Sequence, residues 1–413
     1  MKRILFIINL ALLSAGAFAQ DSIFKKVEKK EYSFTIQDSP ASLFTMRQFN
    51  ENYLSLYRLT INELNGIVSP KASLLLQTAV LGLYFLPLTH EEGHRSILTN
   101  EKIGSISKPY FDKNLAAYVV GVSDAELITL RNSKLPTYIR LHTSGLESDY
   151  AILLREGSLL NWGEEAINVI VLEYFLRKFS YISYYAMGLF KYDTDIKEDT
   201  NELNRDIVGH DVYGAIRHLY RPDMEFYRYT KYNDLSSEEK QFVKRLGWRS
   251  LLNFLDPLLL GKTGFPICNK FSFNFGIGSG MSPFGDFIDE HFWLKTESMK
   301  THFYFRQFEN KNTWFPSLGI DFSNFLLGNN FFTSIALHAW QQPHNLSFTQ
   351  TEGKIGGGMD LTCKYRFPVN IRNKYTGISV NLGIIAKTQG FMLEEVCMDK
   401  HIGFRLGMSI WLN

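Results

Sequence analysis

The sequence predicts an α+β protein in which an α-rich half is followed by an all-β antiparallel half. The first observation is that apolar residues recur at helical spacing between about residues 41 and 260. The second is that the period changes to two after Gly264, where apolar and polar residues alternate. The third is that aromatic content is high, at 15%, and that most of the 33 Phe lie in the second half. We therefore expect one domain over 20–262 and another over 263–413.

The N-terminus has the features of an export signal. Lys2 and Arg3 precede a compact apolar stretch over 4–13, and Ala17-Phe18-Ala19 offers the small residues that signal peptidase prefers. The apolar stretch is too short to span a bilayer as a helix. We expect a signal peptide over 1–19 and an exported mature chain; the alternative is an uncleaved N-terminal anchor.

The charge balance excludes one class of partner. The chain has 44 basic and 42 acidic side chains, so removal of Lys2 and Arg3 leaves 42 of each. A neutral chain has no electrostatic footprint for nucleic acid, and we expect no nucleic-acid partner. The three cysteines are too few for a disulfide framework, although one pair can form in an oxidising periplasm.

The α-rich half is expected to contain five long helices and one short strand over 102–110. The helices are predicted over 72–98, 149–160, 164–189, 202–220 and 237–259. Asp124, Ser148 and Ser236 stand where N-caps belong, and Ser236 opens a polar-then-acidic capping box. Residues 72–88 lack charge, but Gln77, Thr78 and Pro87 favour a buried helix over a membrane span.

The second half is expected to form about eight strands, each with one apolar face and one polar or glycine-rich face. The strands are predicted over 271–277, 292–295, 301–308, 318–325, 333–340, 359–367, 378–384 and 402–412. Long strands of this pattern resemble those of a small, eight-stranded transmembrane β-barrel, with lipid outside and polar residues inside. Asn413 departs from the aromatic residue that usually ends such barrels. The alternative is a soluble β-sandwich, whose strands alternate in the same way.

The chemistry-bearing motif is His90-Glu91-Glu92-Gly93-His94. Histidines at i and i+4 project from one helical face at a spacing that suits one Zn²⁺ ion. This run resembles the HExxH motif of zincin metallopeptidases, and the resemblance implies that Glu91 is the general base that accepts a proton from the attacking water. The alternative is a surface helix end with two unrelated histidines.

A catalytic zinc site needs a third protein ligand. The further downstream histidine of metzincins is absent, so the chain is more similar to zincins whose third ligand is a glutamate on a later helix. We predict Glu147, in a polar segment over 142–150 that precedes an apolar helix. Asp149 is expected to be a ligand or an acceptor that orients a histidine. The alternative is that Ser148 and Asp149 only cap the helix.

A second polar cluster covers residues 206–211. If Glu147 is not a ligand, this cluster and Asp149 are the next candidates. On a helix that starts near Glu202, His210 would stabilise the oxyanion of the tetrahedral intermediate, with Asp206 four residues away on the same face. Tyr213 could have the same role, and a solvated helix face is the alternative for all three.

These observations predict zinc-dependent peptide-bond hydrolysis by an exported metallopeptidase that acts on a peptide or protein substrate. The C-terminal half would contact membrane lipid, which places the protein in the outer membrane, with the periplasm as second choice. One rival is an intramembrane metalloprotease, although a signal peptide and a long β-rich half argue against it. The other rival is a non-catalytic barrel protein that serves as a pore, adhesin or assembly factor.

Overall fold

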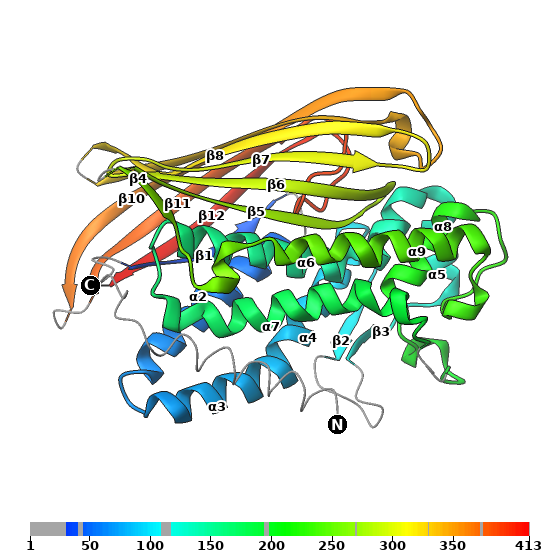
Figure 1. Ribbon diagram of the computed structural model, residues 1–413, viewed down its shortest axis with the longest axis horizontal. Coiled ribbons are helices and arrows are strands. Elements are labelled where there is room, and N and C mark those ends of the chain that lie inside the picture. Colours follow the sequence, from blue (N-terminus) through cyan, green and yellow to red (C-terminus); the bar gives the residue numbers. More distant parts are fainter. Residues whose placement is uncertain are drawn as a thin grey trace.

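The computed structural model describes residues 30–39, 44–108, 117–193, 198–268, 271–328, 330–371 and 375–412. The predicted signal peptide over 1–19 lies outside these residues. The described chain has an α+β fold, as predicted: eight α-helices occupy its first part and a ten-stranded antiparallel sheet its second. The sheet forms a curved layer on one side of the helices, and α3 (Pro70–Val80) lies farthest from it (Figure 1).

The helices begin where the sequence supplies caps. Besides α3, they are α2 (Met46–Leu64), α4 (Leu86–Asn100), α5 (Asp124–Ser133), α6 (Leu135–Asn161), α7 (Ile167–Ala186), α8 (Asp211–Tyr220) and α9 (Ser237–Ser250). Ser236 caps α9 in a capping box with Glu239, as predicted. Ser123 rather than Asp124 caps α5, so that prediction is wrong by one residue. Among the described helices, none combines the length and the apolar character that crossing a bilayer requires.

Two predicted helix boundaries are wrong, and both errors affect the site. Helix α6 begins at Leu135, so Ser148 is not an N-cap; it lies inside the helix and donates to Asn50 Oδ1 and the Thr89 carbonyl. The predicted helix over 202–220 is a 3₁₀ turn at Glu202–Asn204 followed by α8. Gly209 interrupts it with a φ of 66°, in the left-handed region that favours glycine.

Within the predicted strand over 102–110, residues 102–105 are not in a strand, and β2 (Ile106–Lys108) pairs with β3 (Tyr118–Val120); residues 109 and 110 lie outside the described residues. All eight predicted strands of the second half lie within strands of the large sheet. In chain order these are β5 (Phe271–Ser282), β6 (Gly285–Thr296), β7 (Lys300–Glu309), β8 (Trp314–Gly328), β9 (Phe331–Pro343), β10 (Gly353–Ile371), β11 (Tyr375–Lys387) and β12 (His401–Leu412).

Two further strands bring the sheet to ten and lie at its edges. The short β4 (Phe265–Cys268) pairs with β5, and β1 (Lys30–Asp38) pairs with β12. From the sequence we predict only an extended lead-in over about 21–38, because this stretch is charged and short in apolar runs. Among the described residues no ladder joins β1 to β4, so the order runs β1-β12-β11-β10-β9-β8-β7-β6-β5-β4 without a closing pair.

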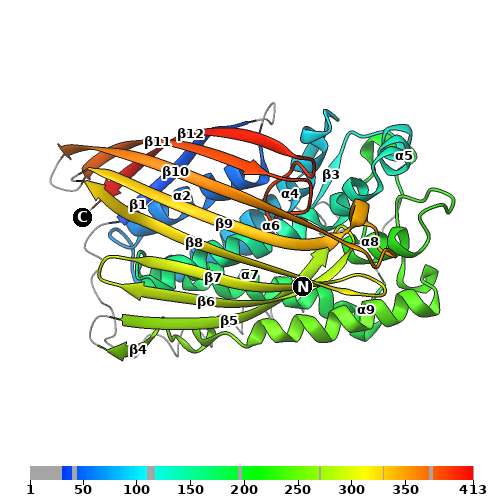
Figure 2. The same ribbon diagram turned by 90° about the horizontal axis from the view of Figure 1, so that it is seen from above.

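The two faces of this sheet have opposite chemistry. Its strands run across α2, α6 and α7, and the face toward these helices is mainly polar (Figure 2). The outward face exposes large apolar side chains, among them Phe292, Leu318, Leu337, Met359, Leu382 and Phe404. At the β6–β7 end, Phe287 and Phe308 join helical residues such as Tyr53 and Leu146 in one buried cluster, so the two halves share a core.

Candidate metal centre

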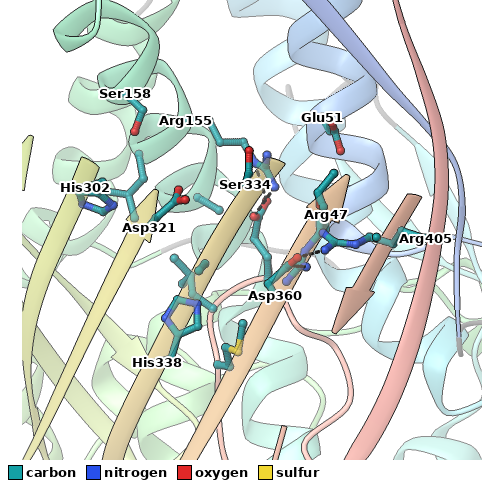
Figure 3. A pocket seen from close by; sticks show the side chains of 18 of the residues that line it. Arg47, Glu51, Arg155, Ser158, His302, Asp321, Ser334, His338, Asp360 and Arg405 are labelled. Atoms are coloured by element: carbon teal, nitrogen blue, oxygen red, sulfur yellow. Dashed lines mark hydrogen bonds and ion pairs between the residues drawn. The ribbon is translucent and has the colours of Figure 1, made fainter. Parts of the chain in front are cut away.

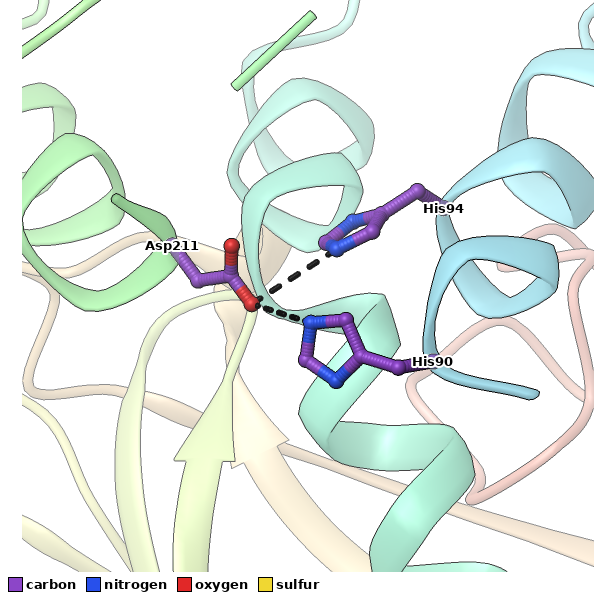
Figure 4. A group of neighbouring side chains, drawn as sticks. All are labelled: His90, His94 and Asp211. Carbon is purple, nitrogen blue, oxygen red and sulfur yellow. Dashed lines mark ion pairs between the residues drawn. The ribbon is translucent and has the colours of Figure 1, made fainter. Parts of the chain in front are cut away.

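Helix α4 carries the His90-to-His94 motif. It follows α3 through a π-helical turn, Leu81–Phe85, and has Pro87 in its first turn, where a missing N–H does not weaken a helix. The imidazoles of His90 and His94 project toward α6 and α8 (Figure 4). The predicted placement of both histidines on one helical face is therefore confirmed.

The third group at this point is Asp211, the first residue of α8. Its Oδ2 atom lies 3.0 Å from His90 Nε2 and 3.6 Å from His94 Nε2. One ligand atom from each of the three residues lies within 4.8 Å of the others, and no other such group of three occurs in the described part of the chain. Because α8 begins only after Gly209, the carboxylate stands at the helix end and faces α4.

The opposite ring nitrogens fix the orientation of both histidines. His90 Nδ1 lies 2.8 Å from Asp149 Oδ2, and His94 Nδ1 lies 2.7 Å from the Leu141 carbonyl oxygen. Both partners are acceptors, so each Nδ1 donates and each Nε2 faces Asp211. Arg177 donates to the other oxygen of Asp149 and holds that carboxylate in place. The prediction of Asp149 as an acceptor that orients a histidine is confirmed.

Glycine keeps the space in front of the histidines open. A Cβ atom at Gly145 of α6 would lie 2.4 Å from His90 Nε2 and 2.5 Å from His94 Nε2. On the other helix, a Cβ at Gly93 would lie 2.4 Å from the Ser144 carbonyl oxygen. The two glycines therefore allow α4 and α6 to pack closely, and Gly145 leaves room for an ion at the imidazoles.

The donor set fits a metal ion. Two imidazole nitrogens face Asp211 Oδ2, and if both rings are neutral, three lone-pair atoms face one another, an arrangement that a proton on His90 or a bridging cation stabilises. Ligand atoms on a tetrahedral zinc ion lie about 3.3 Å apart, close to the two distances from Asp211. Burial would lower the pKa of His90, but Asp211 and Asp149 outweigh it and raise that pKa well above its usual range. The centre thus favours a positive charge.

Glu91 is next to the first histidine and is only 7% exposed. Burial raises the pKa of its carboxyl well above the usual range, and Asp206 adds to this while His90 opposes it. No hydrogen bond or ion pair joins its carboxylate to another described residue. A carboxylate in this setting is a stronger base than one in water, which suits the predicted role in proton transfer.

The predicted third ligand, Glu147, is not part of this group. Arg140 binds both of its carboxylate oxygens, at 2.9 and 2.7 Å, and the Glu394 backbone N–H donates to it as well. The two contacts with Arg140 are buried, and the contact with Glu394 is partly buried. We therefore replace Glu147 by Asp211 as the third candidate ligand, because the guanidinium already neutralises the glutamate.

His210 lies beside the metal centre but not on the helix that we predicted for it. It is the N-cap residue of α8, and its ring stacks on Tyr213 with centroids 3.7 Å apart. Burial lowers its pKa to about 4, so the ring is neutral near neutral pH. Asp206 accepts from the Gly209 backbone N–H and does not share a helical face with His210, so that expectation is wrong.

Tyr184 of α7 is a candidate that the sequence does not reveal. Its ring lies 5.9 Å from that of His90 and 5.0 Å from that of His210. Its hydroxyl accepts from the Asp211 backbone N–H at 3.3 Å, and its O–H is within reach of the Asp211 carboxylate. No pattern along α7 distinguishes it from the other tyrosines there. For Asp211 a signal exists, since an acidic residue after Gly209-His210 begins a helix.

No family model, no curated protein and no solved structure matches this chain. The function is therefore inferred from the geometry of the centre.

Proposed function

We propose that the protein is a zinc-dependent hydrolase that cleaves peptide bonds. The observation that carries the proposal is the convergence of His90 Nε2, His94 Nε2 and Asp211 Oδ2 on one point, with Glu91 adjacent on the same helix. Two histidines and one carboxylate form the protein ligand set of several catalytic zinc sites, which keep a fourth position open. The outer partners Asp149 and Leu141 support this set, as in other zinc enzymes.

Each residue has a distinct role in this proposal. His90, His94 and Asp211 would hold the zinc ion, which supplies a water whose pKa is lowered to about 7. Glu91 accepts a proton from the attacking water and passes it to the leaving amine. The hydroxyl of Tyr184 and the neutral ring of His210 are the side chains available to donate to the oxyanion of the tetrahedral intermediate.

A matched pair of variants tests the chemistry. Glu91→Gln should keep about one zinc per chain and lose hydrolysis of a quenched fluorescent peptide library by a factor of about 10²–10⁴, the usual contribution of a general base. Glu92→Gln makes the same change one residue away, where the side chain pairs with Arg95, and should keep activity. A wild type without zinc, or with zinc and no hydrolysis, would favour the non-catalytic alternative.

We also propose that the protein resides in the outer membrane, where the outward face of the sheet contacts acyl chains and acts as a barrel wall. The support is that alternating residues of β12 point apolar side chains outward, with Ile402 64% and Phe404 60% exposed, while Arg405 faces inward and pairs with Asp360. In a soluble sandwich a second sheet would cover such a face, and no other described layer lies on it. Membrane fractionation of the native protein tests this proposal.

A further inference from the structure

A second polar centre lies beneath the sheet, separate from the metal centre. A cavity of about 330 Å³ lies between the inward face of the sheet and helices α2 and α6 (Figure 3). Small-molecule sites usually span roughly 300–1,000 Å³, so this space suits a small ligand rather than one or two waters. The walls come mainly from β7 to β12, with Glu51 of α2 and Arg155 of α6 opposite.

The floor of the cavity is set by one cross-strand row. His302, Asp321, Ala336 and Asp360 are successive partners on β7, β8, β9 and β10. Neighbouring strands lie about 4.8 Å apart, so the two aspartates are roughly 10 Å apart across Ala336. The small alanine side chain leaves the space between the two carboxylates open.

Most charges at this cavity neutralise one another. Its five cationic side chains all have acidic partners. The pairs are Lys364–Glu31, Arg306–Asp289, Arg155–Glu394, Arg405–Asp360 and Arg47–Asp360, with Glu395 3.8 Å from Arg47. These pairs alone leave no cation in excess, and two further acidic residues belong to the wall.

Asp321 and Glu51 are those two residues. Asp360 is bound by two arginines, whereas no hydrogen bond or ion pair joins Asp321 to another described residue. Glu51 accepts only from the hydroxyl of Thr35, at 2.6 Å, and has no ion pair within the described chain. Burial raises the pKa of Asp321 to about 7, Asp360 adds to this, and Arg155 opposes it. The cavity therefore lacks positive charge, and Asp321 is the carboxylate with the least compensation.

We propose that this cavity binds a small organic cation, an alkylammonium, with Asp321 as its counter-ion. An ammonium supplies the missing charge and N–H donors for the carboxylate. Ala336 and Leu154 offer apolar surface for the alkyl part. An inorganic ion fits less well, because no three ligand side chains converge here among the described residues. The inference does not rest on the metal centre.

Calorimetric titration of the full mature protein with butane-1,4-diamine and with the neutral butane-1,4-diol tests the proposal. We expect one diamine per chain and no heat from the diol. Asp321→Asn should weaken diamine binding at least tenfold, whereas Glu290→Gln, on the exposed outward face of β6, should leave it unchanged. Ala336→Leu, which fills the floor, should abolish binding while far-UV circular dichroism stays native.

Two controls distinguish the cavity from the metal centre and from a site for inorganic cations. Because an amine can ligate zinc, Asp211→Asn should retain diamine binding if the cavity is the site. Loss of binding in that variant, or equal affinity in wild type and Asp321→Asn, would overturn the proposal. Displacement of the diamine by millimolar Mg²⁺ would also overturn it, since the site would then be one for inorganic cations.

Discussion

Two buried aspartates, one in the sheet and one in the helical region, differ in the groups that neutralise their charge. Asp289 of β6 is fully buried, and Arg306 binds both of its oxygens at 2.6 Å. Tyr150 donates to it as well. Asp211 of α8 is 2% exposed, and two imidazole nitrogens face its Oδ2. One carboxylate has a permanently charged partner, and the other has partners that carry charge only when they are protonated.

This difference distinguishes a structural ion pair from a candidate metal-binding site. In both cases burial would raise the pKa of the carboxyl and the neighbours outweigh it: Arg306 at Asp289, and His94 and His90 at Asp211. Arginine stays charged without any outside partner, whereas an imidazole must first take up a proton, or share the carboxylate with a metal ion. A buried acid whose neighbours are histidines is therefore a better candidate for a metal ligand than one that an arginine binds.

The largest expected effect compares the two aspartates directly. Asp211→Asn should weaken zinc binding more than about 100-fold, because loss of a ligand exceeds the 10–100-fold effect of losing an outer partner. Asp289→Asn should keep zinc but lower the free energy of unfolding by about 3–5 kcal/mol, since Arg306 is left buried without its counter-charge. Metal analysis and chemical denaturation measure the two effects. Equal zinc content in both variants would remove the distinction.

The next effect concerns the outward face of the sheet. Phe404→Arg should disfavour membrane insertion by about 2–4 kcal/mol if this position lies near the bilayer centre. The matched control is Trp248→Arg on α9, an aromatic residue that is 58% exposed, against 60% for Phe404. The measurement is the fraction of each variant that sediments with the outer membrane after a carbonate wash.

One outcome of this measurement would contradict the prediction for Phe404→Arg. If Trp248→Arg releases the protein as much as Phe404→Arg does, lipid contact is not specific to the sheet. Ser409, on the inward face of β12, would be a poor control for substitution by arginine. It is fully buried and bonds to Glu31 and Asn381.

A smaller effect is expected from filling the gap at the histidines. Gly145→Ala places a methyl group against both Nε2 atoms, and overpacking of this kind costs about 1–3 kcal/mol, or roughly a 5- to 150-fold loss of zinc affinity. Gly82→Ala is the control, since its Cβ would meet no atom within 4 Å. Competition with a fluorescent zinc chelator measures both. Unchanged affinity in Gly145→Ala would mean that the ion does not lie between the imidazoles.

Sequence periodicity is sufficient to predict most of the fold. The period of two locates eight strands, and the spacing of four residues places His90 and His94 on one face. The period of two is present in β1 as well, where Tyr32, Phe34 and Ile36 alternate with polar residues, but the charged segment around it leads us to expect only an extended lead-in. Sequence periodicity also misses the early start of α6, since the polar residues over 142–149 interrupt the apolar pattern although they are buried.

The third ligand could not be derived from sequence for a similar reason. Glu147 and Asp211 are both acidic residues near a helix, and only tertiary contacts distinguish them. Arg140 lies seven residues before Glu147 on the same helix, two turns away, and a helix predicted to begin at residue 149 does not contain this pair. The break at Gly209 that aims Asp211 depends on a backbone conformation that an isolated glycine does not specify.

The smallest expected effect on zinc tests this correction. Glu147→Gln should leave zinc affinity unchanged, because its carboxylate is bound to Arg140 and not to the histidines. The same variant should lower the free energy of unfolding by about 3–5 kcal/mol, since Arg140 is left buried without its counter-charge. The Arg140 guanidinium keeps its bonds to the Glu395 and Val396 carbonyls, so the fold should survive. Metal content per folded chain is the measurement, with Asp211→Asn alongside. If Glu147→Gln loses zinc and Asp211→Asn retains it, the glutamate is the ligand and the comparison of the two aspartates fails.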